Sequence, residues 1–247
     1  MKLFLTSSPC DGQVPEGVEL PFLLDERGGL VERLRACYRP GMRGVMISAY
    51  PDGHDWNDRD ARDFAASFAY HGMPLSTMTM VDDRNGDDIA NILQGAGLVI
   101  LGGGHVPTEN AFFRKIGLKE ALAGFDGIVM GISAGTMNCA ETVYAQPEED
   151  GEAVDPQYRR FLPGLGLTRL NVLPHYQQVK DRLIDGLRLY EDVTYPDSRG
   201  RTFYALPDGS YILKDEQGTA VFGEAYAIRD GVMTRICGAG EFLPLAD

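Results

Sequence analysis

The chain has 247 residues, of which 44% are hydrophobic and 24% are charged, a balance typical of a soluble globular protein. Its formal net charge of −13 at pH 7 would repel nucleic acid and anionic membrane, so neither is an expected partner. If the ligand is acidic, a local arginine must overcome the repulsion by this net negative charge.

The cysteines and the N-terminus indicate a reducing compartment. The four cysteines form no CxxC pair, which argues against a zinc site or a disulfide framework and favours free thiols. The opening segment, MKLFLTSSPCDG, is too short for a signal peptide, and no apolar stretch approaches the length of a membrane span. We therefore expect a cytoplasmic protein, monomeric or homodimeric.

The first two-thirds of the chain alternate apolar runs with amphipathic stretches. Strand and helix alternating in this way predict parallel βαβ units, and near-continuous apolar runs such as LVIL and GIVM fit a sheet that is covered on both faces. In chain order we expect strands at 2–7, 44–50, 74–80, 98–104, 127–133 and 169–176, and helices at 30–38, 57–72, 87–97 and 107–125.

The sequence pattern changes after about residue 195. The segments 202–215 and 225–237 are β-hairpin candidates, with Asp208-Gly209 and Asp230-Gly231 supplying the turns. We expect both hairpins at one edge of the same sheet. No linker or repeat separates them from the rest, so residues 1–247 are expected to form one α/β domain.

One Gly-x-Ser-x-Gly, centred on Ser133, interrupts the run GIVMGISAGTMNCA. The motif alone is weak in a glycine-rich chain, but its context is that of a nucleophile elbow. An apolar strand leads in and small residues begin a helix, whose N-terminal dipole suits a developing oxyanion. Ser133 is therefore the candidate nucleophile.

A serine nucleophile needs a base, and the chain has four histidines. His71 falls at an expected helix end and His54 in a polar loop, where a solvated side chain is the ordinary case. His175 and His105 each follow an expected strand, where open α/β sheets form ligand sites. We favour His175 as the base, because it comes directly after an apolar strand and Pro174 restricts the backbone before it.

An acidic loop lies between Ser133 and His175, and one of its carboxylates is expected to orient the histidine. Composition does not choose among Glu148, Glu149, Asp150, Glu152 and Asp155. The oxyanion hole would take one backbone N–H from Ala134 and a second from the glycine triplet 102–104, since glycine lets backbone approach a ligand closely.

The segments LGGGH, GISAG and VLPHY, in this order, resemble the peptidase E and cyanophycinase family of serine peptidases. The resemblance extends over roughly residues 1–215. It implies a class I glutamine-amidotransferase-like fold: a three-layer α/β sandwich with a mostly parallel central sheet and helices on both faces, here with antiparallel hairpins at the C-terminal edge. It also implies a triad in the chain order serine, acid, histidine.

Carried over by position, the resemblance makes Ser133 the nucleophile, His175 the base and Glu148 the acid, with Glu149 and Asp150 as adjacent alternatives. Gly104 and Ala134 become the oxyanion donors. Dipeptidase E has Asn where this chain has His105, so His105 is a candidate substrate contact that differs from the family.

The family prefers aspartate at P1, the substrate residue before the scissile bond, and recognises it with an arginine on the helix after the histidine. Arg182 resembles that arginine, and a guanidinium binds a carboxylate at two points. The expected function is therefore hydrolysis of short peptides with aspartate at P1, through an acyl-enzyme and without a metal or cofactor. The alternatives are a cyanophycinase acting on β-aspartyl-arginine, a lipase-like esterase and a non-catalytic binding module.

Overall fold

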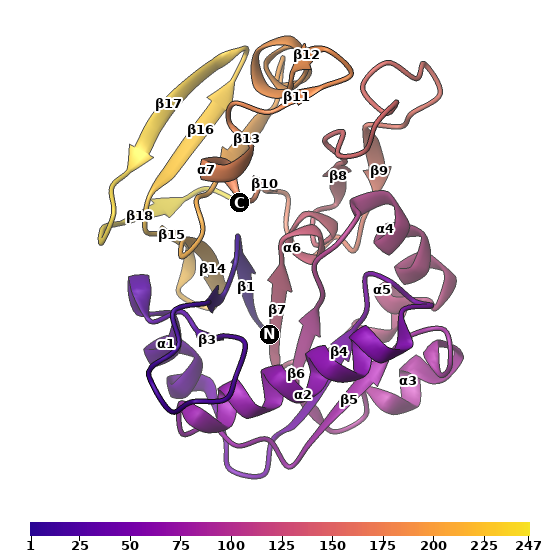
Figure 1. Cartoon of the computed structure of the whole chain (residues 1–247), viewed down its shortest axis with the longest axis vertical. Helices are drawn as coiled ribbons and strands as arrows, with labels where there is room; N and C mark the ends of the chain where they lie inside the picture. Colours follow the sequence, from indigo (N-terminus) through magenta and orange to yellow (C-terminus); the bar gives the residue numbers. More distant parts are fainter.

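The central feature of the fold is an eight-stranded sheet with the order β18-β15-β14-β1-β7-β6-β4-β5 (Figure 1). The five strands from β1 to β5 in this order run parallel, and the three before them join antiparallel. The computed structural model describes residues 1–247, and the strands of this sheet are β1 (Lys2–Thr6), β4 (Arg43–Ile47), β5 (Thr77–Val81), β6 (Ala96–Leu101), β7 (Ile128–Ile132), β14 (Tyr211–Asp215), β15 (Gly218–Phe222) and β18 (Phe242–Leu245).

A second sheet of four strands lies at the other end of the molecule, drawn mostly in orange and yellow in Figure 1. Its order is β10-β13-β16-β17, in which only β10 and β13 are parallel. These strands are β10 (Asn171–Leu173), β13 (Thr202–Ala205), β16 (Ala225–Arg229) and β17 (Val232–Cys237). Three two-stranded ribbons complete the β-structure: β2 (Cys10–Asp11) with β3 (Leu23–Leu24), β8 (Thr142–Tyr144) with β9 (Phe161–Pro163), and β11 (Leu183–Ile184) with β12 (Leu187–Arg188).

The helices are short apart from α2. They are α1 (Leu30–Cys37), α2 (His54–Tyr70), α3 (Ile89–Ile92), α4 (Val106–Lys115), α5 (Leu118–Ala121), α6 (Ala134–Asn138), α7 (Tyr176–Val179) and α8 (Tyr195–Asp197), with 3₁₀ turns at Arg27–Gly29 and Gly86–Asp88 and a π-helical turn at Leu189–Thr194. None of them is both long enough and apolar enough to cross a bilayer.

Alternate residues of each central strand pack on opposite faces of the sheet, as strand geometry requires. Leu3 and Leu5 belong to a cluster of 24 buried residues that includes Phe112 of α4. Phe4 belongs to a separate cluster of 16 that includes Phe64 of α2. Helices therefore cover both faces, and the expected three-layer α/β sandwich with a mostly parallel central sheet is confirmed.

The expected elements of the first two-thirds are present, with two differences. The stretch 107–125 is two helices rather than one, because Gly117 adopts φ 66° and ends the first helix. The expected helix at 87–97 shrinks to Ile89–Ile92, since β6 already begins at Ala96.

One of the two predicted C-terminal hairpins is wrong. Strands β16 and β17 do form a hairpin over 225–237, but it belongs to the second sheet and does not lie, as expected, at an edge of the central sheet. Residues 202–215 do not form a hairpin, because β13 pairs in the second sheet while β14 pairs with β1 in the central sheet. Asp208-Gly209 does form a turn, in which Ser210 N donates to Pro207 O at 3.1 Å, but this turn leads from one sheet to the other and closes no hairpin. This turn carries Asp208 to the side chain of His175.

Candidate active site

Ser133 lies on a sharp turn between β7 and α6, at the carboxyl edge of the parallel strands. Its backbone has φ 49° and ψ −109°, a conformation that residues other than glycine rarely adopt. The Ser133 N–H faces the end of β1, where the carbonyls of Thr6 and Ser7 accept at 3.3 and 3.2 Å. The strand–turn–helix context expected of a nucleophile elbow is thus present.

The two glycines of the motif are required by close packing. A Cβ on Gly131 would lie 2.7 Å from both N and Cα of Thr136, and one on Gly135 would lie 2.6 Å from the carbonyl oxygen of Gly102. The Gly135 N–H also donates to that same carbonyl at 3.0 Å. Helix α6 is therefore pressed against the glycine loop after β6, which fixes the position of Ser133.

His175 meets Ser133 from the second sheet. It follows β10 and Pro174, has φ 56° and caps α7. Its Nε2 lies 2.9 Å from Ser133 Oγ, and its Nδ1 lies 2.7 Å from Oδ1 of Asp208. A continuous hydrogen-bonded series therefore runs from Ser133 through His175 to Asp208.

Asp208 is held by donors on both carboxylate oxygens. Ser7 Oγ donates to Oδ1 at 2.7 Å, while the side-chain amides of Gln177 and Gln178 donate to Oδ2 at 2.6 and 2.7 Å. Burial would raise the pKa of Asp208, but the hydrogen bonds from His175, Ser7 and Gln177 and the charge of His175 outweigh it and lower the pKa to about 2. Asp208 is therefore an acceptor-only carboxylate at neutral pH, and the His175 nitrogen that faces it must carry the proton.

Glu148 does not contact His175, which corrects the expectation that it is the acidic partner. Its loop turns away toward the start of α4. There the Glu148 N–H donates to Oε2 of Glu152 at 2.7 Å, and its carbonyl accepts from Nη2 of Arg182 at 2.5 Å. Neither Glu149 nor Asp150 contacts the histidine. The carboxylate that does contact His175, Asp208, follows the histidine in the chain and does not precede it.

Of the two expected oxyanion donors, Ala134 directly follows Ser133, but the glycine beside the serine is not the expected Gly104. The backbone N–H groups of Ala134, Gly103 and Gly104 make no hydrogen bond within the protein, whereas that of Gly102 donates to Ile47. A Cβ on Gly103 would lie 3.4 Å from Cβ of Ser133, but one on Gly104 would meet Ala49 and the Tyr50 ring. Gly103 is therefore the loop residue that lies directly against the serine.

His105 and Arg182, expected as substrate contacts, both bind the acidic loop. The two ring nitrogens of His105 lie 2.7 Å from Thr108 Oγ1 and 2.8 Å from Glu152 Oε1. Arg182 is exposed, and its one hydrogen bond goes to the carbonyl of Glu148. His105 thus ties the glycine loop to the acidic loop, and Arg182 brings a positive charge beside it.

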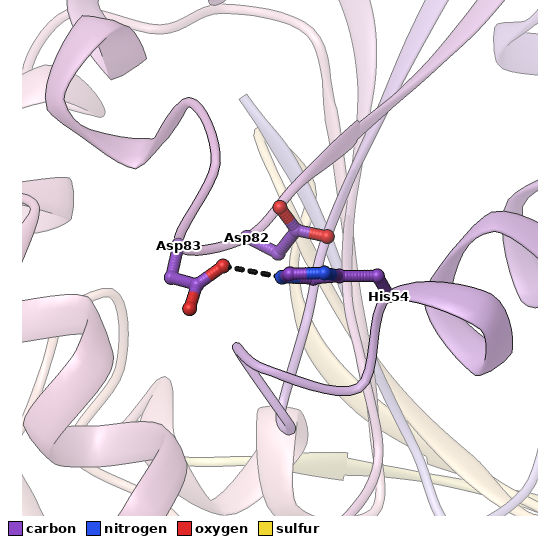
Figure 2. A group of neighbouring side chains, drawn as sticks. All are labelled: His54, Asp82 and Asp83. Carbon is purple, nitrogen blue, oxygen red and sulfur yellow. Dashed lines mark hydrogen bonds and ion pairs between the residues drawn. The ribbon is translucent and has the colours of Figure 1, made fainter.

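A separate polar cluster lies along the same edge of the sheet, beyond β4 (Figure 2). His54 Nε2 lies 2.6 Å from Oδ1 of Asp83, and Asp82 is close by. The Asp82 carboxylate is fully buried and already binds the guanidinium of Arg84 and the amide of Asn57. Because a fixed arginine charge repels a cation, we do not assign a metal to this cluster.

Sequence reasoning missed Asp208, although a signal for it exists. Strands β10 and β13 run parallel with Leu173 opposite Ala205, and Leu206 N donates to Leu173 O at 2.9 Å. Leu-Pro-His ends the β10 segment at 173–175, and Leu-Pro-Asp comes after β13 at 206–208. Paired parallel strands bring the residues after their carboxyl ends side by side, so the repeated Leu-Pro step points to a His–Asp pair. Ser7, Gln177 and Gln178 carried no comparable signal.

Two comparisons with known proteins found matches. The family model for peptidase family S51 matches residues 57–222. A crystal structure from Listeria monocytogenes EGD-e, described as a "Putative Peptidase E Protein", superposes with a TM-score of 0.56 at 14% sequence identity. That match covers 95% of this chain and 98% of the other, and at this identity it shows a shared fold. No curated protein matched by sequence. Because the family model spans more than half of the chain, the protein belongs to peptidase family S51 and is a serine peptidase of the peptidase E kind.

Proposed function

We propose that the enzyme hydrolyses short peptides through a Ser133–His175–Asp208 triad and an acyl-enzyme. The observation that carries this proposal is the hydrogen-bonded series of 2.9 and 2.7 Å that links the three side chains. Ionised Asp208 keeps the proton on Nδ1 of His175, which leaves Nε2 free to accept the proton of Ser133. Asp208 takes the role that sequence position had given to Glu148.

In the acylation step, Ser133 Oγ attacks the scissile carbonyl as its proton passes to His175 Nε2. The resulting oxyanion accepts hydrogen bonds from the N–H of Ala134 and from the glycine loop, where Gly103 and Gly104 both have free donors. His175 then gives its proton to the leaving amine, the C–N bond breaks and an ester to Ser133 remains. Water, deprotonated by His175, hydrolyses that ester and restores the enzyme.

For the substrate, we propose aspartate at P1 with Arg182 as its recognition residue. The hydrogen bond from Arg182 to the Glu148 carbonyl supports this assignment. It keeps a guanidinium beside the acidic loop, which is itself bound to His105, the residue that follows the glycine loop. A local arginine would also offset the repulsion that an acidic substrate meets on a chain of net charge −13. We propose no direct substrate contact for His105, since both of its ring nitrogens already bind protein side chains.

The test is a hydrolysis screen of the purified protein with α-Asp-X dipeptides, Leu-X dipeptides, β-Asp-Arg and a p-nitrophenyl ester. We expect cleavage of Asp-X, abolished by Ser133→Ala. Arg182→Ala should lower activity on Asp-X far more than on Leu-X, while Arg188→Ala, which alters an exposed arginine paired with Asp192, should change neither. Equal losses on both dipeptide classes would remove Arg182 from specificity.

A β-aspartyl-arginine hydrolase of the cyanophycinase type is the alternative that a specific observation favours. The loop near Arg182 carries Glu148, Glu149 and Glu152, which would attract a substrate arginine. Cleavage of β-Asp-Arg in preference to α-Asp-X would establish that alternative. Cleavage of the ester alone would favour an esterase, and no turnover together with no labelling by a fluorophosphonate would favour a binding module.

A further inference from the structure

A groove of about 500 Å³ lies at the end of the second sheet that is opposite to His175 and Asp208. Its walls are the starts of β8, β10 and β13, the end of β16 and residues 246–247, and most of the lining residues are polar. The basic residues that line it are Arg169, Arg201 and Arg229, and the acidic ones are Glu141 and Asp247. On a chain of net charge −13, this local excess of positive charge favours a polar, negatively charged ligand.

Two of these arginines are held in place by contacts that leave most of their N–H groups free. Arg229 lies opposite Thr202 in the pairing of β13 with β16, and its Nε donates to Thr202 Oγ1 at 3.0 Å. The guanidinium of Arg201 lies 4.2 Å from the centre of the Phe161 ring, a cation–π contact that uses none of its donors. Neither arginine forms an ion pair within the protein, so both planar groups can still bind an oxyanion at two points.

The third arginine shows that the groove accommodates an acidic residue of the chain itself. Thr168 Oγ1 and the N–H of Arg169 donate to Oδ1 of Asp247 at 2.9 and 2.8 Å, and Nη2 of Arg169 donates to the Asp247 carbonyl at 2.6 Å. Nζ of Lys214 lies 2.5 Å from Oδ2 of the same carboxylate. This end of the groove is therefore satisfied, and the free donors are those of Arg201 and Arg229.

Two hydroxyl groups add to these donors. Thr142 and Tyr204 line the groove, and neither hydroxyl makes a hydrogen bond within the protein. Two guanidinium groups and two hydroxyls present more donors than a single carboxylate can accept. We propose that the groove binds a small multivalent oxyanion, a molecule that carries at least two phosphate or carboxylate groups.

The groove is separate from the active site. Asn171 lines it at the start of β10, and His175 lies four residues further along the chain, a distance of about 13 Å in extended backbone. An anion bound between Arg201 and Arg229 therefore does not reach Ser133, and its binding does not depend on the proposed hydrolysis.

The experiment titrates the purified protein with inorganic diphosphate and, separately, with citrate, by isothermal titration calorimetry at low ionic strength. We expect saturable one-to-one binding of at least one of these anions, and at least 10-fold weaker binding of acetate, which carries one anionic group. Tighter binding of diphosphate would identify a phosphate ligand, and tighter binding of citrate would identify a carboxylate ligand. No saturable binding of either anion would overturn the proposal.

Variants locate the bound anion. Arg201→Gln and Arg229→Gln should each weaken its binding by about 10-fold or more, the effect expected when one charged hydrogen-bond partner is removed. Arg201→Lys, which keeps the charge without the planar group, should retain part of the affinity. Unchanged binding in both glutamine variants would refute the proposed site.

Arg188→Gln is the matched control, because it makes the same change in net charge at an exposed arginine that is paired with Asp192. It should bind the anion as the wild type does, and so should Arg182→Ala and Ser133→Ala. An equal loss in Arg188→Gln would reveal a general effect of charge, and a loss in Arg182→Ala would place the anion at the active site. Either result would contradict a separate site in the groove.

Discussion

Replacing Asp208 by asparagine should reduce kcat far more than any change to the acidic loop. The substitution keeps the shape of the side chain, removes its charge and turns one acceptor oxygen into a donor. The two oxygens of Asp208 now accept from four side chains: Ser7 and His175 on Oδ1, and Gln177 and Gln178 on Oδ2. An asparagine can satisfy only one of these pairs.

The surroundings decide which pair is lost. Oε1 of Gln177 accepts from the backbone N–H of Asp208 at 3.0 Å, which fixes its amide group with the NH₂ toward Oδ2. Ser7 can rotate its hydroxyl and His175 can change tautomer, so the new NH₂ should face His175. The imidazole would then carry its proton on Nε2 and could not accept one from Ser133. A wrong tautomer of this kind lowers kcat by about 10⁴-fold in a serine protease triad.

The assay measures kcat on N-acetyl-Asp-p-nitroanilide, together with the rate of fluorophosphonate labelling, which reports serine activation without substrate recognition. We expect Asp208→Asn to lower both by about 10³- to 10⁴-fold. Glu148→Gln should leave both unchanged, because its carboxylate does not contact His175. If Asp208→Asn kept more than about a tenth of wild-type kcat, or if Glu148→Gln lost as much as Asp208→Asn, the assignment of the acid would be refuted.

Two other perturbations test the same geometry. Gly135→Ala should destabilise the fold by about 1–3 kcal/mol and slow fluorophosphonate labelling of Ser133, because the added Cβ would meet backbone carbonyls. Gly12→Ala is the control: its Cβ would meet nothing within 4 Å, so the melting temperature should change little. The lowered pKa of Asp208 should contribute about 2.5 kcal/mol to the free energy of unfolding at a pH above its ordinary pKa of 3.8. This contribution is lost as the pH falls through about 2. Denaturation curves measured at a series of acidic pH values should show the loss in the wild type and not in Asp208→Asn.

The sequence was informative wherever local chemistry dictated the structure. Ser133 is identifiable because its strained turn requires Gly131 and Gly135, whose missing side chains make room for Thr136 and the Gly102 carbonyl. His175 is identifiable because it comes directly after an apolar strand. Both arguments depend only on residues within a few positions of the site, and the alternation of strands and helices behind them is equally local.

Asp208, the acidic member of the proposed triad, could not be predicted from local sequence because its position depends on which strands pair. Asp208 is 33 residues from His175 in sequence and reaches it only because β13 joins β10 in the second sheet before the chain crosses to β14. The dipeptide Asp-Gly, a strong hairpin signal, predicts a turn between two strands of one sheet. The acidic loop at 148–155 is favoured by sequence because it lies between the serine and the histidine. In the structure it binds His105 and Arg182.

The pairing of β10 with β13 also explains why the site needs the second sheet. Leu-Pro occurs at the end of β10, at 173–174, and directly after β13, at 206–207, and each proline fixes the backbone there. The hydrogen bond from Tyr176 N to Leu206 O continues the pairing past Pro174, so the segments that carry His175 and Asp208 are held together by backbone bonds as well as by the contact of the two side chains. Ser7 then joins this pair to the central sheet, since its hydroxyl accepts from His175 N at 2.7 Å and donates to Asp208, while its carbonyl accepts from Ser133 N. A serine from one sheet and a base from another thus meet through the end of β1, and a change at Ser7 would disturb their alignment without touching the reacting atoms.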